Sequence, residues 1–88
     1  MQDERKINNF SIFTPDEQAI KRALGGAIRS IRKRKGLSQE RVAELSGLHR
    51  TFFGNLERGV HSVSVYNLIL ISNALGVKPS DILQEMQY

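Results

Sequence analysis

The chain has 88 residues, no cysteine and a formal net charge of +4. This length predicts one small domain, and the lack of cysteine excludes disulfides and thiolate metal sites. No apolar run approaches the roughly 20 residues of a membrane span, and residues 1–6 lack the apolar centre of a signal peptide, so we expect a cytoplasmic protein.

Residues 1–13 show no strong periodicity, and we expect them to form an arm before a domain of residues 14–88. The arm ends with three apolar side chains, Phe10, Ile12 and Phe13. They can pack on the domain or on a partner subunit, and a disordered tail is the alternative.

A first long helix is predicted from residue 14 to the glycine at position 36. Thr14 is the expected N-cap, Pro15 suits the first helical position, and Glu17 completes a capping box. Apolar residues then recur at helical spacing. Gly25 and Gly26 interrupt the pattern and indicate either close helix packing or a local weakness.

Two short helices around a tight turn are predicted next. Ser38 is the expected N-cap of a helix over residues 39–45, and Gly47 can stop it at positive φ. A second helix follows over residues 49–58. Two helices joined by a short turn with glycine are the pattern of a DNA-reading helix-turn-helix. The apolar side of the first of these helices is expected to consist of Val42, Ala43 and Leu45.

The second of these helices divides into an inner and an outer side. Phe53 and Leu56 supply the inner side, and Phe52 is a further candidate for it. The outer side offers arginine, threonine and asparagine, whose groups can pair with base edges. A solvated polar face is the alternative interpretation. The outer residues are Arg50, Thr51, Gly54, Asn55 and Arg58.

Two more helices complete the chain. Ser64 caps the first, over residues 65–75, and Gly76 ends it. A last helix is predicted from Pro79 to about residue 87, with Ile82 and Leu83 inward. The helix over residues 65–75 carries a second stripe, Tyr66, Leu70 and Asn73, which indicates a protein–protein surface or more core packing. Its core side is expected to be Val65, Leu68, Ile71, Ser72 and Leu75.

Positive charge is concentrated around the two short helices. Residues 21–61 carry ten Lys or Arg and three Glu, a net of +7, whereas the rest carries three basic and six acidic residues. A face that binds a polyanion needs such an asymmetry, which therefore favours nucleic acid.

These motifs resemble the Cro and phage-repressor type of helix-turn-helix family, often called XRE. The resemblance lies in residues 36–40, 42–43, 47 and 56–59 and continues through residues 64–77. It implies an all-α, lambda-repressor-like bundle of about five helices. Residues 47–54 (GLHRTFFG) are similar to the controller proteins of restriction–modification systems.

The resemblance also implies roles for single residues. Gln39 matches the glutamine that clamps the DNA backbone. Arg32 and Glu57 occupy the positions of a structural ion pair that ties the first helix to the recognition helix. The C-terminal region often forms the dimer contact in this family. On that basis the expected interface residues are Tyr66, Leu70, Ile82 and Met86.

The expected binding mode is a two-fold homodimer on a palindrome in double-stranded DNA, with helix 49–58 in the major groove. Arg50 and Thr51 are the expected principal base readers, Asn55 the next, and His49 can touch a base or a phosphate. The expected backbone contacts are Gln39, Lys33, Lys35, Phe52, Arg58 and His61, where Phe52 can equally complete the core and His61 can equally face solvent.

The expected function is therefore a transcriptional regulator that can autoregulate its own operon. An antitoxin that binds its promoter and a toxin is the alternative, and a protein-interaction adaptor is a third. An enzyme is the weakest reading, because we find no nucleophile–base pair, paired carboxylates or phosphate-binding loop. We expect no cofactor, metal or small-molecule ligand, and a partner protein is a further candidate.

Overall fold

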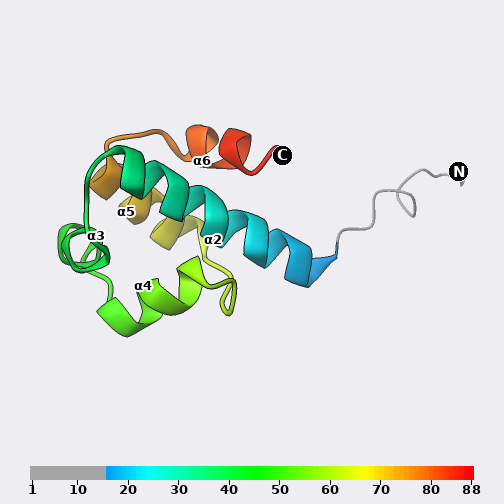
Figure 1. Cartoon of the computed structure of the whole chain (residues 1–88), viewed down its shortest axis with the longest axis horizontal. Coiled ribbons are helices and arrows are strands. Elements are labelled where there is room, and N and C mark those ends of the chain that lie inside the picture. Colours follow the sequence, from blue (N-terminus) through cyan, green and yellow to red (C-terminus); the bar gives the residue numbers. More distant parts are fainter. Residues whose placement is uncertain (1–15) are drawn as a thin grey trace, which may run out of the picture.

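The computed structural model describes residues 16–88, and within them every regular element is a helix (Figure 1). The elements follow the predicted order, with a long first helix and four short ones. Their bounds are α2 Glu17–Arg34, α3 Gln39–Ser46, α4 Arg50–Glu57, α5 Val65–Leu75 and α6 Pro79–Glu85. Over residues 16–88, the expected all-α class and the expected number of about five helices are confirmed.

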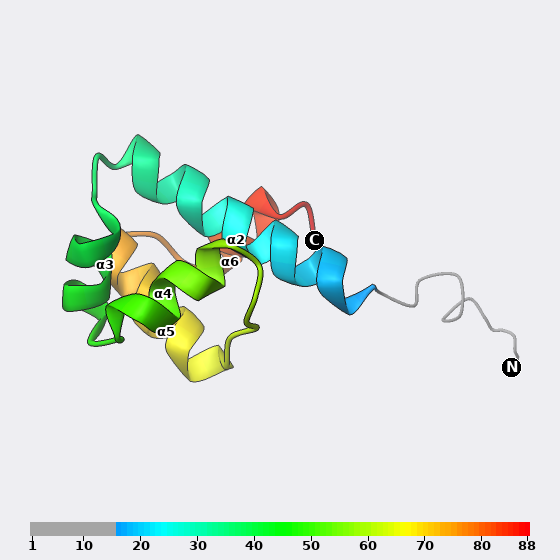
Figure 2. The same ribbon diagram turned by 60° about the horizontal axis from the view of Figure 1, so that its bottom comes forward.

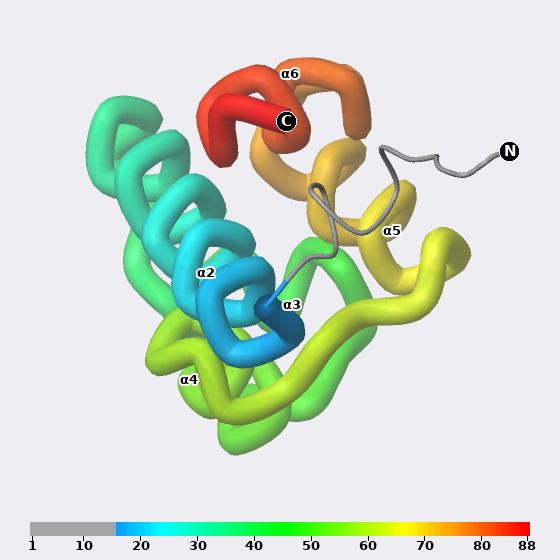
Figure 3. Tube along the Cα trace, turned by 90° about the vertical axis from the view of Figure 1, so that its right-hand side faces the viewer, coloured from blue at the N-terminus to red at the C-terminus, as the bar shows by residue number. Residues whose placement is uncertain are grey.

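The long helix α2 separates two parts of the domain. The short helices α4 and α6 lie on opposite sides of α2, a relation that is clear both from the side and down the long axis (Figures 1 and 3). The pair α3 and α4 forms the helix-turn-helix (Figure 2). The largest fully buried side chains between the helices are Phe53, Ile28, Leu56, Ile71, Ile82 and Val42.

The predicted serine caps are present. The Ser38 hydroxyl accepts from the backbone N–H of Arg41 at 3.0 Å, and Ser64 accepts in the same way from Asn67 at 3.0 Å. The turn between α3 and α4 passes through Gly47 at φ +76°, a conformation that L side chains avoid. Local hydrogen bonds and backbone conformation therefore set where α3 and α5 begin and where α3 ends.

The first helix begins later than the sequence suggested. Asp16 is its N-cap, and the carboxylate accepts from the backbone N–H groups of Gln18 and Ala19 at 3.0 and 3.4 Å. An aspartate cap serves the same free N–H groups as a threonine and adds a negative charge at the positive end of the helix. The expected cap Thr14, Pro15 and the arm of residues 1–13 lie outside the described residues.

Gly25 marks a close approach of α2 to α4. A Cβ atom at this position would lie 2.5 Å from the carbonyl oxygens of both Leu56 and Glu57. These are backbone atoms and cannot rotate away, so a side chain here would push the two helices apart. Of the two explanations for the glycine pair, close packing therefore holds for Gly25. At Gly26 a Cβ would meet nothing within 4 Å.

Three apolar residues expected in the core are exposed, so these predictions were wrong. Leu45 is 47% exposed because Ser46, one step further around α3, takes the inward position instead. Val65 is 74% exposed, since it begins α5 before the buried positions start. On α6, Ile82 fills the core and Leu83 faces outward.

Candidate nucleic-acid interface

The first turn of α4 presents the two side chains that we expected to read bases. Arg50 and Thr51 are both exposed at the start of the helix. His49, by contrast, is the N-cap, because its Nδ1 atom accepts the backbone N–H of Thr51 at 3.0 Å. The ring nitrogen nearest the helix is thus already used, which leaves Nε2 as the free polar atom of His49.

A polar hollow of about 270 Å³ lies between the start of α3 and the outer face of α4. Two guanidinium groups and one hydroxyl line it. A glycine also lines it and contributes no side chain. Such donors favour an anion, and the free N–H groups at the start of α3 add to this preference. The lining residues are Gln39, Arg50, Thr51, Gly54 and Arg58.

Three helices meet at the carboxylate of Glu57. Arg32 on α2 donates from Nε at 2.6 Å and from Nη2 at 3.1 Å. Gln39 on α3 donates from its amide at 2.8 Å to the same carboxylate. The side chain of Glu57 is 2% exposed, so the network is dry, and Arg32 also donates to the carbonyl of Leu37 at 2.8 Å. The implied ion pair is therefore present in the structure.

This network gives Gln39 an intramolecular partner that sequence reasoning did not anticipate. Its amide nitrogen is committed to Glu57, so the amide oxygen is the atom that faces the hollow, 3.9 Å from where a Cβ of Gly54 would lie. Gln39 thereby joins the hollow to the ion pair. The contact spans 18 positions of the chain, and no local sequence pattern announces it.

Side-chain contacts within the chain also engage Asn55, Phe52 and His61. Asn55 accepts a hydrogen bond from Nη2 of Arg58 on the next turn. The ring of His61 stacks on Phe52, with centroids 5.6 Å apart and planes at 13°. Phe52 itself is half-buried and packs on the core. The structure thus gives Asn55, Phe52 and His61 contacts within the chain beside any contact that they make with DNA.

Glu40 is a member of the site that the sequence analysis did not name. Its carboxylate lies 3.6 Å from Nε of Arg50, and both side chains are exposed. The signal was available, because the helix-turn-helix places the first turns of α3 and α4 close together. An exposed pair of this kind contributes little to stability.

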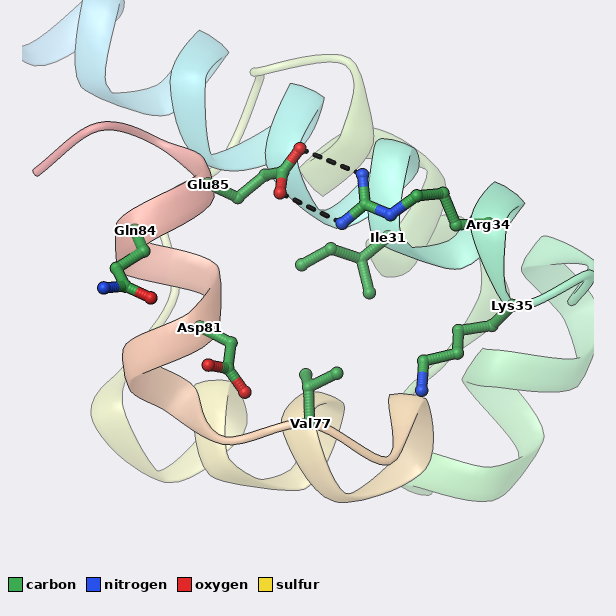
Figure 4. A pocket seen from close by; sticks show the side chains of 7 residues that line it. All are labelled: Ile31, Arg34, Lys35, Val77, Asp81, Gln84 and Glu85. Carbon is green, nitrogen blue, oxygen red and sulfur yellow. Dashed lines mark hydrogen bonds and ion pairs between the residues drawn. The ribbon is translucent and has the colours of Figure 1, made fainter.

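The basic end of α2 divides between the two sides of the domain. Lys33 is exposed and follows Arg32, whose side chain reaches α4. Lys35 instead points toward the turn between α5 and α6, near Gly76, where it lines a second hollow of about 370 Å³ (Figure 4). Because α6 and α4 lie on opposite sides of α2, the placement of Lys35 argues against its expected contact with the same DNA backbone.

The second hollow has a balanced charge and so offers no anion site. Arg34 and Glu85 form a two-point ion pair across its edge, with N–O distances of 3.1 and 3.0 Å (Figure 4). The Arg34 guanidinium, together with the Ser30 hydroxyl, lowers the pKa of the Glu85 carboxyl, and Glu85 in turn raises the pKa of Arg34. This pair fastens α6 to α2.

The four expected interface residues fall into different environments. Tyr66 is 71% exposed, and Leu70 on the next turn of α5 is half-buried. Met86 packs partly against the core. Ile82 is fully buried within the single chain and has no surface to offer a second one, so we leave it out of the interface proposed below.

Residues 16–88 offer neither a membrane span nor a metal cluster. Over this range no helix combines the length and apolar character that a membrane span needs. In the same part of the chain, His, Asp and Glu side chains do not gather in a group of three suited to a metal ion.

The comparisons with known proteins agree with this geometry. The helix-turn-helix family model matches residues 28–82, which include α3, α4 and most of the core. The chain belongs to this helix-turn-helix family. Its membership makes it a DNA-binding transcriptional regulator rather than an enzyme.

Named members of the family share much of this chain. Control protein C.BamHI of Bacillus amyloliquefaciens is 45% identical over 65 residues, covering 73% of this chain and 80% of that protein. Control protein C.SmaI of Serratia marcescens is 42% identical over 64 residues, covering 73% and 76%. The crystal structure of the restriction–modification controller protein C.AhdI from Aeromonas hydrophila is 40% identical, with a TM-score of 0.69 over 70% of this chain and 94% of that one.

Proposed function

We propose that this protein controls transcription of a restriction–modification operon by binding a palindromic operator as a homodimer. The similarity to C.BamHI, C.SmaI and C.AhdI supports the operon. The polar hollow beside the first turn of α4 is the single observation that carries DNA binding, since it gathers two guanidinium groups on an exposed helix face.

In this proposal α4 enters the major groove with its first turn foremost. Arg50 reads a guanine edge, and Thr51 contributes a hydroxyl and a methyl group to a neighbouring base. Asn55 is a secondary reader, because its oxygen is already shared with Arg58. His49 contributes its free Nε2 to a base or a phosphate at the edge of the site.

Backbone contacts set the position of the domain on the duplex. Gln39 and Arg58 act from the hollow, and Lys33 acts from the end of α2. Phe52 and His61 form one stacked unit beside α4, and we assign this unit to the sugar–phosphate backbone rather than to a base. Lys35 takes no part, since it lies on the α6 side (Figure 4).

We assign the dimer contact to the exposed side of α5. Tyr66 and Leu70 form its centre, and Val65 and Ile69 extend it. Met86, the C-cap of α6, is a further candidate. A second copy is the occupant that fits, because one domain reads only a few base pairs and a two-fold dimer doubles the contact with a palindrome. A Tyr66→Asp variant should sediment as a monomer at concentrations where the wild type is a dimer.

The experiment that tests the function is selection of bound duplexes from a random pool at moderate salt. We expect a palindromic sequence with half-sites about 34–36 Å apart, or a multiple of one DNA turn. The same sequence should occur upstream of the gene for this protein, next to genes for a methyltransferase and an endonuclease. Recovery of no sequence that outcompetes genomic fragments would refute the proposal. A toxin gene beside it would favour the antitoxin alternative instead.

A further inference from the structure

Gly54 lies in the interior of α4, where a glycine needs an explanation. Its φ is not among the positive values of the described residues, so the backbone conformation suits any residue. Glycine in a helix interior is less favourable than alanine, because it loses more conformational freedom on folding. The recognition helix α4 is only eight residues long, so the lower helix propensity of this glycine affects the element that forms the site.

The chain itself has room for a side chain at this position. Gly54, expected on the outer side of α4, is buried, and the nearest atoms over it are the side-chain ends of Arg58 and Gln39. A Cβ on Gly54 would lie 3.6 Å from Nη1 of Arg58 and 3.9 Å from Oε1 of Gln39, both ordinary van der Waals distances. Gly25 is the contrast, since a Cβ there would lie 2.5 Å from two backbone carbonyl oxygens. Packing within the domain therefore explains the glycine at position 25 and leaves that at position 54 unexplained.

The space that a side chain at position 54 would take belongs to the polar hollow. Gly54 lines it together with Arg50, Thr51 and Arg58. Arg58 uses Nη2 for Asn55, whereas Nη1 faces the hollow and has no hydrogen-bond acceptor among the described residues. Hydrogen-bond donors outnumber acceptors in the hollow. The oxygen nearest to Gly54 is Oε1 of Gln39. The carboxylate of Glu40 lies beside Nε of Arg50.

We propose that position 54 is a glycine for the sake of DNA binding, because the missing side chain lets a phosphodiester group of the duplex enter this hollow. The phosphate oxygens then meet Nη1 of Arg58, which leaves the free nitrogens of Arg50 for the guanine edge. Gly54 is thus a positioning residue that sets how closely α4 approaches the DNA. This inference rests on the function proposed above and adds to it the occupant of the hollow.

The test compares Gly54→Ala with Gly26→Ala, a control for the change in helix propensity at an exposed site away from the hollow. Gly26 also lies inside a helix, and its Cβ would meet nothing within 4 Å. Both variants should raise Tm by about 4–8 °C, because alanine is the better helix former and neither site is crowded. Only Gly54→Ala should weaken binding, by about tenfold, since the loss of one charge-assisted hydrogen bond has roughly that effect.

The DNA titrations use the selected operator and a random duplex, each at several salt concentrations. For Gly54→Ala we expect both affinities to fall and the salt slope to become shallower by about one unit, as the loss of one phosphate contact requires. Unchanged affinity in Gly54→Ala would overturn the inference, and so would a fall in its Tm. A loss confined to the operator would place a base edge in the hollow and overturn the phosphodiester assignment. If the wild type itself shows no preferred duplex, the proposed function fails instead.

Discussion

The guanidinium of Arg32 meets the carboxylate of Glu57 at two points, with Nε at 2.6 Å and Nη2 at 3.1 Å. This contact joins the long helix α2 to the last residue of α4. Gln39 on α3 donates to the same carboxylate. The recognition helix is thereby fixed to both of its neighbours by one buried carboxylate.

Replacement of Glu57 by Gln should therefore be strongly destabilising. The variant leaves the Arg32 charge buried without a counter-charge, which typically costs about 3–5 kcal/mol. Urea denaturation measures the change in the free energy of unfolding. A double variant, Arg32→Met with Glu57→Met, should lose less than the single one because no charge remains buried. A single variant within about 0.5 kcal/mol of the wild type, the range typical of surface substitutions, would contradict this account of the pair.

Removal of the Arg50 side chain should relax sequence preference at one base position of each half-site. We expect a loss of about 1–3 kcal/mol on the operator and a much smaller loss on random DNA. Competition binding against operators with each base pair changed in turn gives the measurement. Equal weakening on operator and random DNA would show that Arg50 contacts the backbone and not a base.

The two lysines at the end of α2 offer a comparison of equal charge changes. Lys33→Ala should weaken binding to every sequence and reduce the salt slope by about 0.9. Lys35→Ala should leave both quantities nearly unchanged, because its side chain lies in the hollow beside α6 (Figure 4). Fluorescence anisotropy over a range of salt concentrations distinguishes them. Identical behaviour of the two variants would mean that only net charge matters.

The ion pair between Arg34 and Glu85 predicts a pH dependence of stability. Because the pKa of Glu85 is lowered in the folded state, its contribution is present above the ordinary value of 4.5 and is lost as the pH falls through the lowered pKa. Tm of Glu85→Gln should thus lie slightly below that of the wild type at neutral pH, and the gap should close in acid. Thermal melts from pH 7 to pH 3 measure it, and a gap that widens in acid would reverse the assignment.

The sequence allowed the helices to be predicted closely wherever a cap is local. The limits of α5 follow from Ser64 and Gly76, which act on backbone groups within a few residues. The start of α2 was misplaced because Thr14, Asp16 and Glu17 are all good N-terminal residues, and the pattern alone does not rank them. Leu45 was misplaced because an apolar residue next to the core stripe resembles a member of it.

The candidate site was predictable in its residue types and less so in its contacts. The exposed guanidinium and hydroxyl groups of α4 follow from helical periodicity. The partnership of Gln39 with Glu57 and of Glu40 with Arg50 depends on how α3 crosses α4, which is a tertiary relation. Such contacts decide which atoms remain free. The helix-turn-helix pattern brings the first turns of α3 and α4 together, but sequence spacing alone does not say which of their side chains pair.

The buried junction at Glu57 has a consequence for the operator. Because α4 is fixed to both α2 and α3, it has little freedom to follow an irregular groove. The conformational change on binding therefore falls mainly on the DNA. Sequence-dependent bending and twisting of the spacer between half-sites then enter the affinity, even at base pairs that no side chain touches.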